Sequence, residues 1–140
     1  MEKNSVKING LEQQPFIIET DTTISSGYKG RLIVKSGTLT LKGEIIGSLE
    51  IHNNADATIR GNVIGTIGVF DGGNITIYNS VDGSLKIDSG GKATVESGGR
   101  VTGNIVNYGR AVLKGTLHGE QLGSEKVIIK GGMIISEQSL

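Results

Sequence analysis

Apolar and polar residues alternate along most of this chain, in short runs that follow regularly spaced glycines. The block GEIIGSLEIHNNADATIR, residues 43–60, is followed by GNVIGTIGVFDGGNITIY, residues 61–78, which repeats the same order. Alternation with a period of two is typical of strands, not helices. The marker glycines lie 16 to 20 residues apart, which indicates a solenoid with about 18 residues per coil. They are Gly30, Gly47, Gly65, Gly83, Gly103 and Gly119.

Each repeat carries apolar residues at three points, which predicts a coil with three short walls. In residues 43–60, Ile45 marks the first wall, Leu49 and Ile51 the second, and Ile59 the third. The same spacing predicts that Met133 faces inward on the first wall of the last coil. We therefore expect an all-β fold, a triangular parallel β-helix of about six coils, each rising about 4.8 Å.

The repeat also predicts the domain organisation. Residues 1–15 are mostly polar and end at Pro15, the only proline, so we expect a flexible N-terminal lead-in. Residues 16–136 are expected to form a single β-helix domain, in which residues 16–24 make an incomplete first coil. Residues 137–140 are expected to be a C-terminal tail.

Composition narrows the class of function. The 14 basic residues balance 14 acidic ones, so the chain lacks the basic surplus typical of nucleic-acid-binding proteins. Because there is no cysteine, neither a disulfide nor a thiolate metal site holds the fold. No signal-peptide pattern and no apolar run of membrane-spanning length occurs. We expect a cytoplasmic protein with no integral membrane segment and no cofactor.

Two known architectures have coils of 18 residues. Hexapeptide acyltransferases carry serine, threonine, alanine or valine at the fifth place of each six. Here that place, counted from the aliphatic-glycine pairs, is occupied by Glu50, Gly68, Asp71 and Lys126. Residues 27–135 instead repeat another order, which is glycine, any residue, aliphatic, any residue, glycine, polar, aliphatic. This repeat resembles that of the bactofilins, which are bacterial polymer-forming cytoskeletal proteins. This resemblance implies a right-handed triangular β-helix. Members of that family often carry proline-rich tails, whereas the residues on either side of this repeat are few and contain a single proline.

Residues capable of catalysis or metal binding are sparse and isolated. His52 and His118 each follow an inward aliphatic residue, so we expect both on the surface without a nucleophile nearby. Asp71, Asp82 and Asp88 each precede glycine, directly or after one serine, as aspartates in turns often do. The three aspartates are unequally spaced, unlike the tandem pattern of calcium-binding repeats. We therefore expect the protein not to be an enzyme and not to bind metal.

Two kinds of surface remain as candidates for function. The last coil is apolar almost to the chain end and no capping helix is visible, which favours end-to-end self-assembly. The residues expected at these ends are Phe16, Ile18, Met133, Ile134 and Ile135. Outward apolar residues on the side would favour a different protein partner. These are Ile46, Ile64, Phe70 and Tyr78.

The two surfaces correspond to two functional hypotheses. In the first, the chain is a non-enzymatic structural protein that assembles through its terminal coils into a bactofilin-like cytoskeletal scaffold. In the alternative, it is a stand-alone protein-binding module that blocks a partner, such as the immunity protein of a bacterial toxin.

Overall fold

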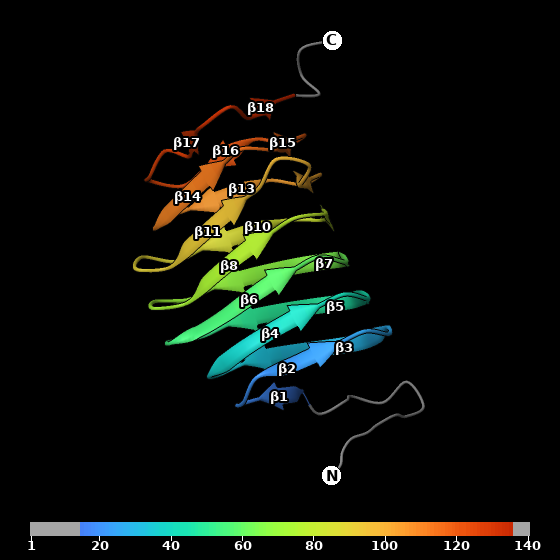
Figure 1. The fold of residues 1–140 in the computed structure, drawn as a ribbon. Helices are drawn as coiled ribbons and strands as arrows, with labels where there is room; N and C mark the ends of the chain where they lie inside the picture. Colours follow the sequence, from blue (N-terminus) through green and yellow to red (C-terminus); the bar gives the residue numbers. More distant parts are fainter. Residues whose placement is uncertain (1–14, 136–140) are drawn as a thin grey trace.

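The computed structural model describes residues 15–135, and every element in that range is a β-strand. The strands stack into a parallel β-helix, with the first coil at the blue end and the last at the red end (Figure 1). The predicted all-β parallel β-helix is confirmed. Residues 1–14 of the predicted lead-in (1–15) and the predicted tail (137–140) fall outside the described residues.

The strands belong to two sheets. The smaller sheet has seven strands, which are β2 (Thr22–Ile24), β4 (Gly37–Leu41), β6 (Ala55–Ile59), β8 (Asn74–Ile77), β11 (Lys92–Val95), β14 (Arg110–Leu113) and β17 (Ile128–Ile129). The larger sheet has eleven, which are β1 (Phe16–Ile18), β3 (Tyr28–Val34), β5 (Glu44–Ile51), β7 (Asn62–Val69), β9 (Ser80–Asp82), β10 (Leu85–Ile87), β12 (Arg100–Val101), β13 (Ile105–Asn107), β15 (Thr116–Leu117), β16 (Gln121–Leu122) and β18 (Met133–Ile134).

The larger sheet is folded into two walls at the column of marker glycines. We call the part before these glycines wall 1, the part after them wall 2, and the seven-stranded sheet wall 3. β5 and β7 each run through walls 1 and 2, whereas the next coil divides the same path into β9 and β10. Each wall has seven rungs, one more than the six coils expected, and residues 16–24 supply rungs to walls 2 and 3 only, as predicted for an incomplete first coil.

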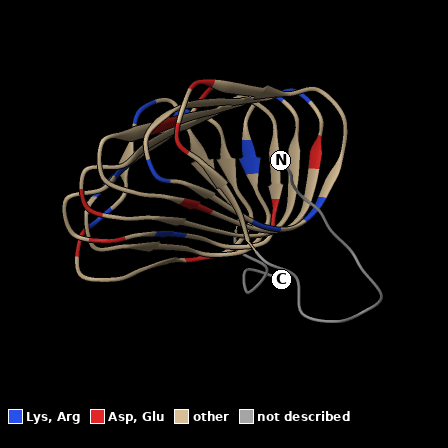
Figure 2. Ribbon diagram, turned by 90° about the horizontal axis from the view of Figure 1, so that it is seen from below, with Lys and Arg blue, Asp and Glu red and all other residues tan. Residues whose placement is uncertain are grey.

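Residues of equal position in successive coils form columns because every strand pair is parallel and in register. Ile45 pairs with Val63, and Leu49 pairs with Ile67. These inward columns make a continuous aliphatic core in which side chains such as Leu32 and Ile59 are fully buried. Seen along the stack, the coils enclose a flattened interior (Figure 2).

The corner between walls 1 and 2 requires glycine. Gly65 has a φ of 141° and Gly83 a φ of 155°, in a region that side-chain-bearing residues rarely adopt. A Cβ atom on Gly65 would overlap the carbonyl oxygen of Gly47 in the coil below. The marker glycines that define the sequence repeat are thus the residues that let successive corners stack.

Met133 does not face the core, contrary to the sequence prediction. It pairs with Thr116, and its side chain is 59% exposed on the outside of wall 1. Ile134 pairs with Leu117 and packs against the core. The reason is an additional residue at the preceding corner, Gly131 at a φ of 81°, which shifts the alternation by one position.

Candidate functional site

The N-terminal end of the stack presents aromatic side chains. Phe16 pairs with Leu32 in an inward column of wall 2, yet it is 39% exposed because it belongs to the first described coil. Its ring lies 5.6 Å from that of Tyr28, which occupies the inward column of wall 1. Ile18, beside Phe16 in β1, is buried. Phe16 and Tyr28 therefore make an apolar face at this end.

The C-terminal end is also apolar. Ile129 pairs with Leu113 in an inward column of wall 3, but it is 48% exposed since no described residue stacks beyond it. Ile134 lies in the inward column of wall 1. On wall 2 the column ends in Gln121, whose Oε1 accepts a hydrogen bond from the backbone N–H of Val127 at 3.0 Å. The last coil is thus polar on one wall and open on the other two.

A buried amide holds the backbone near this end. Among residues 15–135, Asn107 is the only fully buried polar residue; it lies in the wall 2 column directly after Ile87. Its Nδ2 donates to the carbonyl oxygens of Glu125 and Lys126, at 3.2 and 3.4 Å, and its Oδ1 accepts from the N–H of Gly109 at 3.0 Å. The core therefore gives way to a polar contact just below the last coil.

The five predicted end residues occupy two different environments. Phe16, Ile18 and Ile134 lie in inward columns, whereas Met133 and Ile135 are exposed on the outside of wall 1. Ile129, which is not among the predicted end residues, is the most exposed apolar residue of the inward columns at the C-terminal end. The sequence prediction places the end of the stack at the last apolar residues of the chain. In the structure, however, β17 and β18 belong to the same coil, so Ile129 in β17 is at the end as well.

The four predicted side residues lie in three separate places. Ile46 and Ile64 are direct neighbours on wall 1, each 39% exposed. Tyr78 lies at the corner between walls 3 and 1, with the guanidinium carbon of Arg60 4.3 Å from its ring centroid. Phe70 lies at the corner between walls 2 and 3, across the coil from wall 1. The structure brings only the two isoleucines of this set together.

Phe70 is half-buried against other side chains of its own surface. Its ring centroid lies 4.6 Å from that of His52 in the coil below. The ring also covers Gly68, since its Cζ lies 3.6 Å from where a Cβ would stand on that glycine. The ring therefore fills the space left by a glycine on the outside of wall 2. This packing explains the aromatic residue at this position, and no partner protein is needed to account for it.

His52 belongs to a chain of polar contacts on the surface. Its Nε2 lies 3.1 Å from Oε1 of Glu50, and Oε2 of Glu50 accepts a hydrogen bond from Nε of Arg31 at 2.8 Å. Partial burial alone would raise the pKa of Glu50, but the hydrogen bonds from Arg31 and His52 outweigh it and lower the pKa. The contact between Arg31 and Glu50 was not predicted from the sequence, because the two residues lie in different coils.

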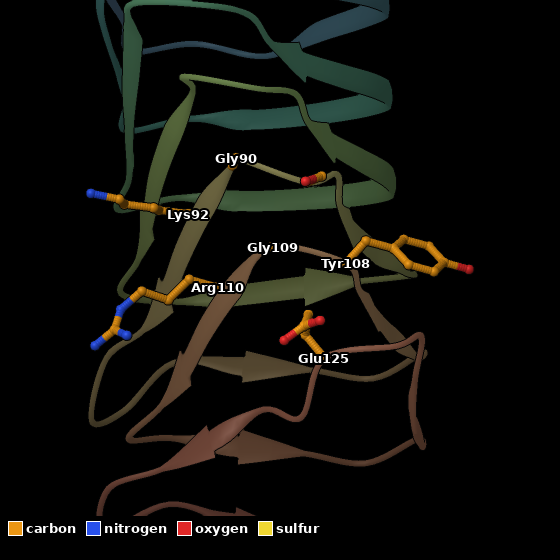
Figure 3. A pocket seen from close by; sticks show the side chains of 8 residues that line it. Gly90, Lys92, Tyr108, Gly109, Arg110 and Glu125 are labelled. Carbon is orange, nitrogen blue, oxygen red and sulfur yellow. The ribbon is translucent and has the colours of Figure 1, made fainter.

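A shallow depression lies at the corner between walls 2 and 3. Four residues, 88–91, connect β10 to β11, but only Tyr108 and Gly109 connect β13 to β14. The shorter connection leaves a hollow of about 330 Å³. In Figure 3, Lys92 and Arg110 point to one side and Tyr108 to the other, while Glu125 lies between them. Because the two basic side chains and the tyrosine point away from the hollow, they do not form a convergent binding site with Glu125.

Wall 3 carries an axial gradient of charge on its outer surface. One outward column contains the residues at or just before the start of each wall 3 strand. In the first coils this column holds Asp21 and Asp56, and in the later coils it holds Lys92 and Arg110. Lys126, just before the inward Val127, continues this column in the last coil. Charged residues otherwise lie all around the stack (Figure 2). The first and last coils thus differ in sign along one edge of wall 3.

The centre of wall 3 is a column of threonines. Thr40, Thr58, Thr76 and Thr94, evenly spaced in the sequence, are register partners. Thr23 extends the column by one coil toward the N-terminus. Stacked β-branched residues stabilise adjacent strands, so the column has a structural explanation.

No group of three or more histidine, aspartate or glutamate residues suited to a metal ion occurs in residues 15–135. Within the same residues, no helix is long and apolar enough to cross a membrane. Comparisons of the chain with models of protein families, with curated proteins and with solved structures returned no match.

Proposed function

We propose that the protein is a non-enzymatic structural protein whose terminal coils stack on those of other copies, as in a bactofilin-like scaffold of a bacterial cytoplasm. The observation that carries this proposal is that the inward columns run to both ends of the stack. Phe16 at one end and Ile129 at the other are core residues by position and surface residues by exposure.

Stacking would remove two unfavourable features at once. The terminal strands have backbone N–H and C=O groups on one edge without a strand partner in residues 15–135, and such edges pair readily with other strands. The apolar side chains beside those edges would leave water on contact, which is favourable in proportion to the area buried. Both ends would offer the same kind of contact, so association would continue beyond a dimer.

Sedimentation velocity over a hundredfold range of protein concentration tests this proposal, followed by negative-stain imaging of the largest species. We expect an open series of species that grows with concentration, and rods or filaments as thick as one stack. A single monomeric species at every concentration would overturn the proposal.

A second candidate function is a protein-binding module that blocks a partner, such as a toxin's immunity protein. The observation that favours it is the pair Ile46 and Ile64, adjacent and exposed in the middle of wall 1. Exposed apolar neighbours can mark a partner site, although the pair is small for a whole interface. Under this hypothesis the protein is monomeric and Ile64→Asp abolishes partner binding.

A further inference from the structure

We infer that the copies stack head to tail, the last coil of one on the first coil of the next, so that the assembly has a direction. This inference rests on the proposed end-to-end assembly and specifies its geometry. The occupant of each end is a second copy of the same chain.

The path of the chain around the stack favours this orientation. The first described strand, β1, lies on wall 2, and the last, β18, lies on wall 1, so the described helix makes a whole number of coils. A coil proceeds from wall 2 to wall 3 to wall 1. The first coil of a second copy therefore begins on the wall that would come next, and β1 and β2 would lie along β16 and β17 as further parallel strands.

The core residues at the two ends match on walls 1 and 3 in this arrangement, whereas on wall 2 Phe16 of the second copy meets Gln121. Continuing the columns places Ile24, which pairs with Leu41, on Ile129, which pairs with Leu113. On wall 1, Tyr28 of the second copy meets Ile134. Apolar surface thus meets apolar surface on both walls that are open at the C-terminal end.

The charges on wall 3 distinguish this orientation from its alternatives. Head-to-tail stacking places Lys126 of one copy beside Asp21 of the next, in one outward column. If two C-terminal ends met through a two-fold axis crossing wall 3, Lys126 would instead face Lys130 of the second copy, and like charges so close repel. Unlike charges at the two ends thus favour the polar arrangement.

Engineered cysteines test the direction without interference, since the chain has none of its own. Thr23 lies in the central outward column of the first coil on wall 3, and Ile128 lies in the same column of the last. Adjacent rungs are about 4.8 Å apart, within the range that a disulfide spans. We would mix equal amounts of Thr23→Cys and Ile128→Cys, one carrying a mass tag, oxidise them mildly and identify the cross-linked pairs by mass.

Head-to-tail stacking predicts disulfides between Thr23→Cys and Ile128→Cys and few between identical variants. Disulfides within each variant alone would overturn the direction while leaving end-to-end assembly in place. Failure of the unmodified protein to associate in sedimentation would overturn the proposed function itself and this inference with it.

A charge exchange gives a second readout that does not depend on oxidation. Lys126→Asp should weaken association by a few-fold in the head-to-tail arrangement, because it places two carboxylates together. Adding Asp21→Lys to the same chain should restore association. If C-terminal ends met each other, Lys126→Asp would strengthen association instead, since the new carboxylate would face Lys130.

Discussion

The backbone of Gly65 lies directly on the carbonyl group of Gly47, one coil below, with no space for a side chain between them. The same relationship recurs between Gly83 and Gly65. The corner between walls 1 and 2 therefore depends on a stack of bare backbones.

Gly65→Ala should lower the free energy of unfolding by about 3 kcal/mol or more, because it combines backbone strain with a steric clash in the middle of the stack. Urea unfolding followed by circular dichroism measures the change. Gly98→Ala is the matched control: Gly98 has a φ of 92°, but no atom lies within 4 Å of its Cβ position. We expect this control to cost only about 1 kcal/mol. Equal effects at both positions would show that the stacked corner is unimportant.

Asn107→Leu should destabilise the last coils although leucine fits an aliphatic column. The substitution leaves the carbonyl oxygens of Glu125 and Lys126 without the side-chain donor, and the expected cost is about 2 to 3 kcal/mol. Hydrogen exchange should quicken in residues 123–127 in particular. As a control, Ile87→Val in the preceding coil removes one methylene from the same column and should cost about 1 kcal/mol. A rise in stability with leucine would contradict the assigned role.

Glu50 should stabilise the protein in a pH-dependent way. Its pKa is lower in the folded state than its ordinary value of 4.5, so the stabilisation is present above that pH and is lost as the pH falls through the lower folded-state value. Between neutral pH and about pH 5, Glu50→Gln should reduce stability by at most about 1 kcal/mol, because Arg31 is largely exposed. The difference should vanish in acid and shrink at high salt. A difference that grows toward low pH would exclude this account.

Ile129→Asp should weaken self-association at least tenfold, or about 1.4 kcal/mol, because it places a charge in a contact that excludes water. Sedimentation velocity measures the change, and thermal unfolding confirms that the variant folds. Ile46→Asp introduces the same charge at a comparably exposed position on wall 1, away from both ends. It should leave association unchanged. Weaker association of Ile46→Asp than of Ile129→Asp would place the contact between copies on wall 1 and contradict end-to-end stacking.

The repeat was predictable because each coil repeats one local pattern. Period-two alternation reports which residues face inward, and in-register stacking repeats that pattern, so Leu49 and Ile67 could be assigned to the core from sequence. Met133 could not, because a single additional glycine at a corner reverses the alternation and leaves no mark in the hydrophobic pattern itself. Met133→Asp, although it changes one of the predicted end residues, is therefore expected to act on the outer surface and to affect stacking little.

Contacts between coils were less predictable than the coils themselves. The pairing of Ile46 with Ile64 follows from equal spacing, but Phe70 lies at another corner because β7 turns from wall 1 to wall 2 at Gly65 and ends at Val69, directly before it. Asn107 occupies a core position that a sequence reader assigns to an aliphatic residue, and its need for hydrogen bonds becomes visible only once residues 125 and 126 stand beside it. Such contacts depend on coil lengths, which vary along this chain.

Each coil in this stack is held only by the coils directly before and after it, so the molecule behaves as a one-dimensional array in which unfolding begins where a neighbour is missing. The terminal coils should therefore fray while the coils around β5 and β7 remain closed. A coil covered by another copy no longer has a free edge, so stacking would protect the whole chain against local opening and proteolysis. Assembly and longevity would then be two results of the same contact.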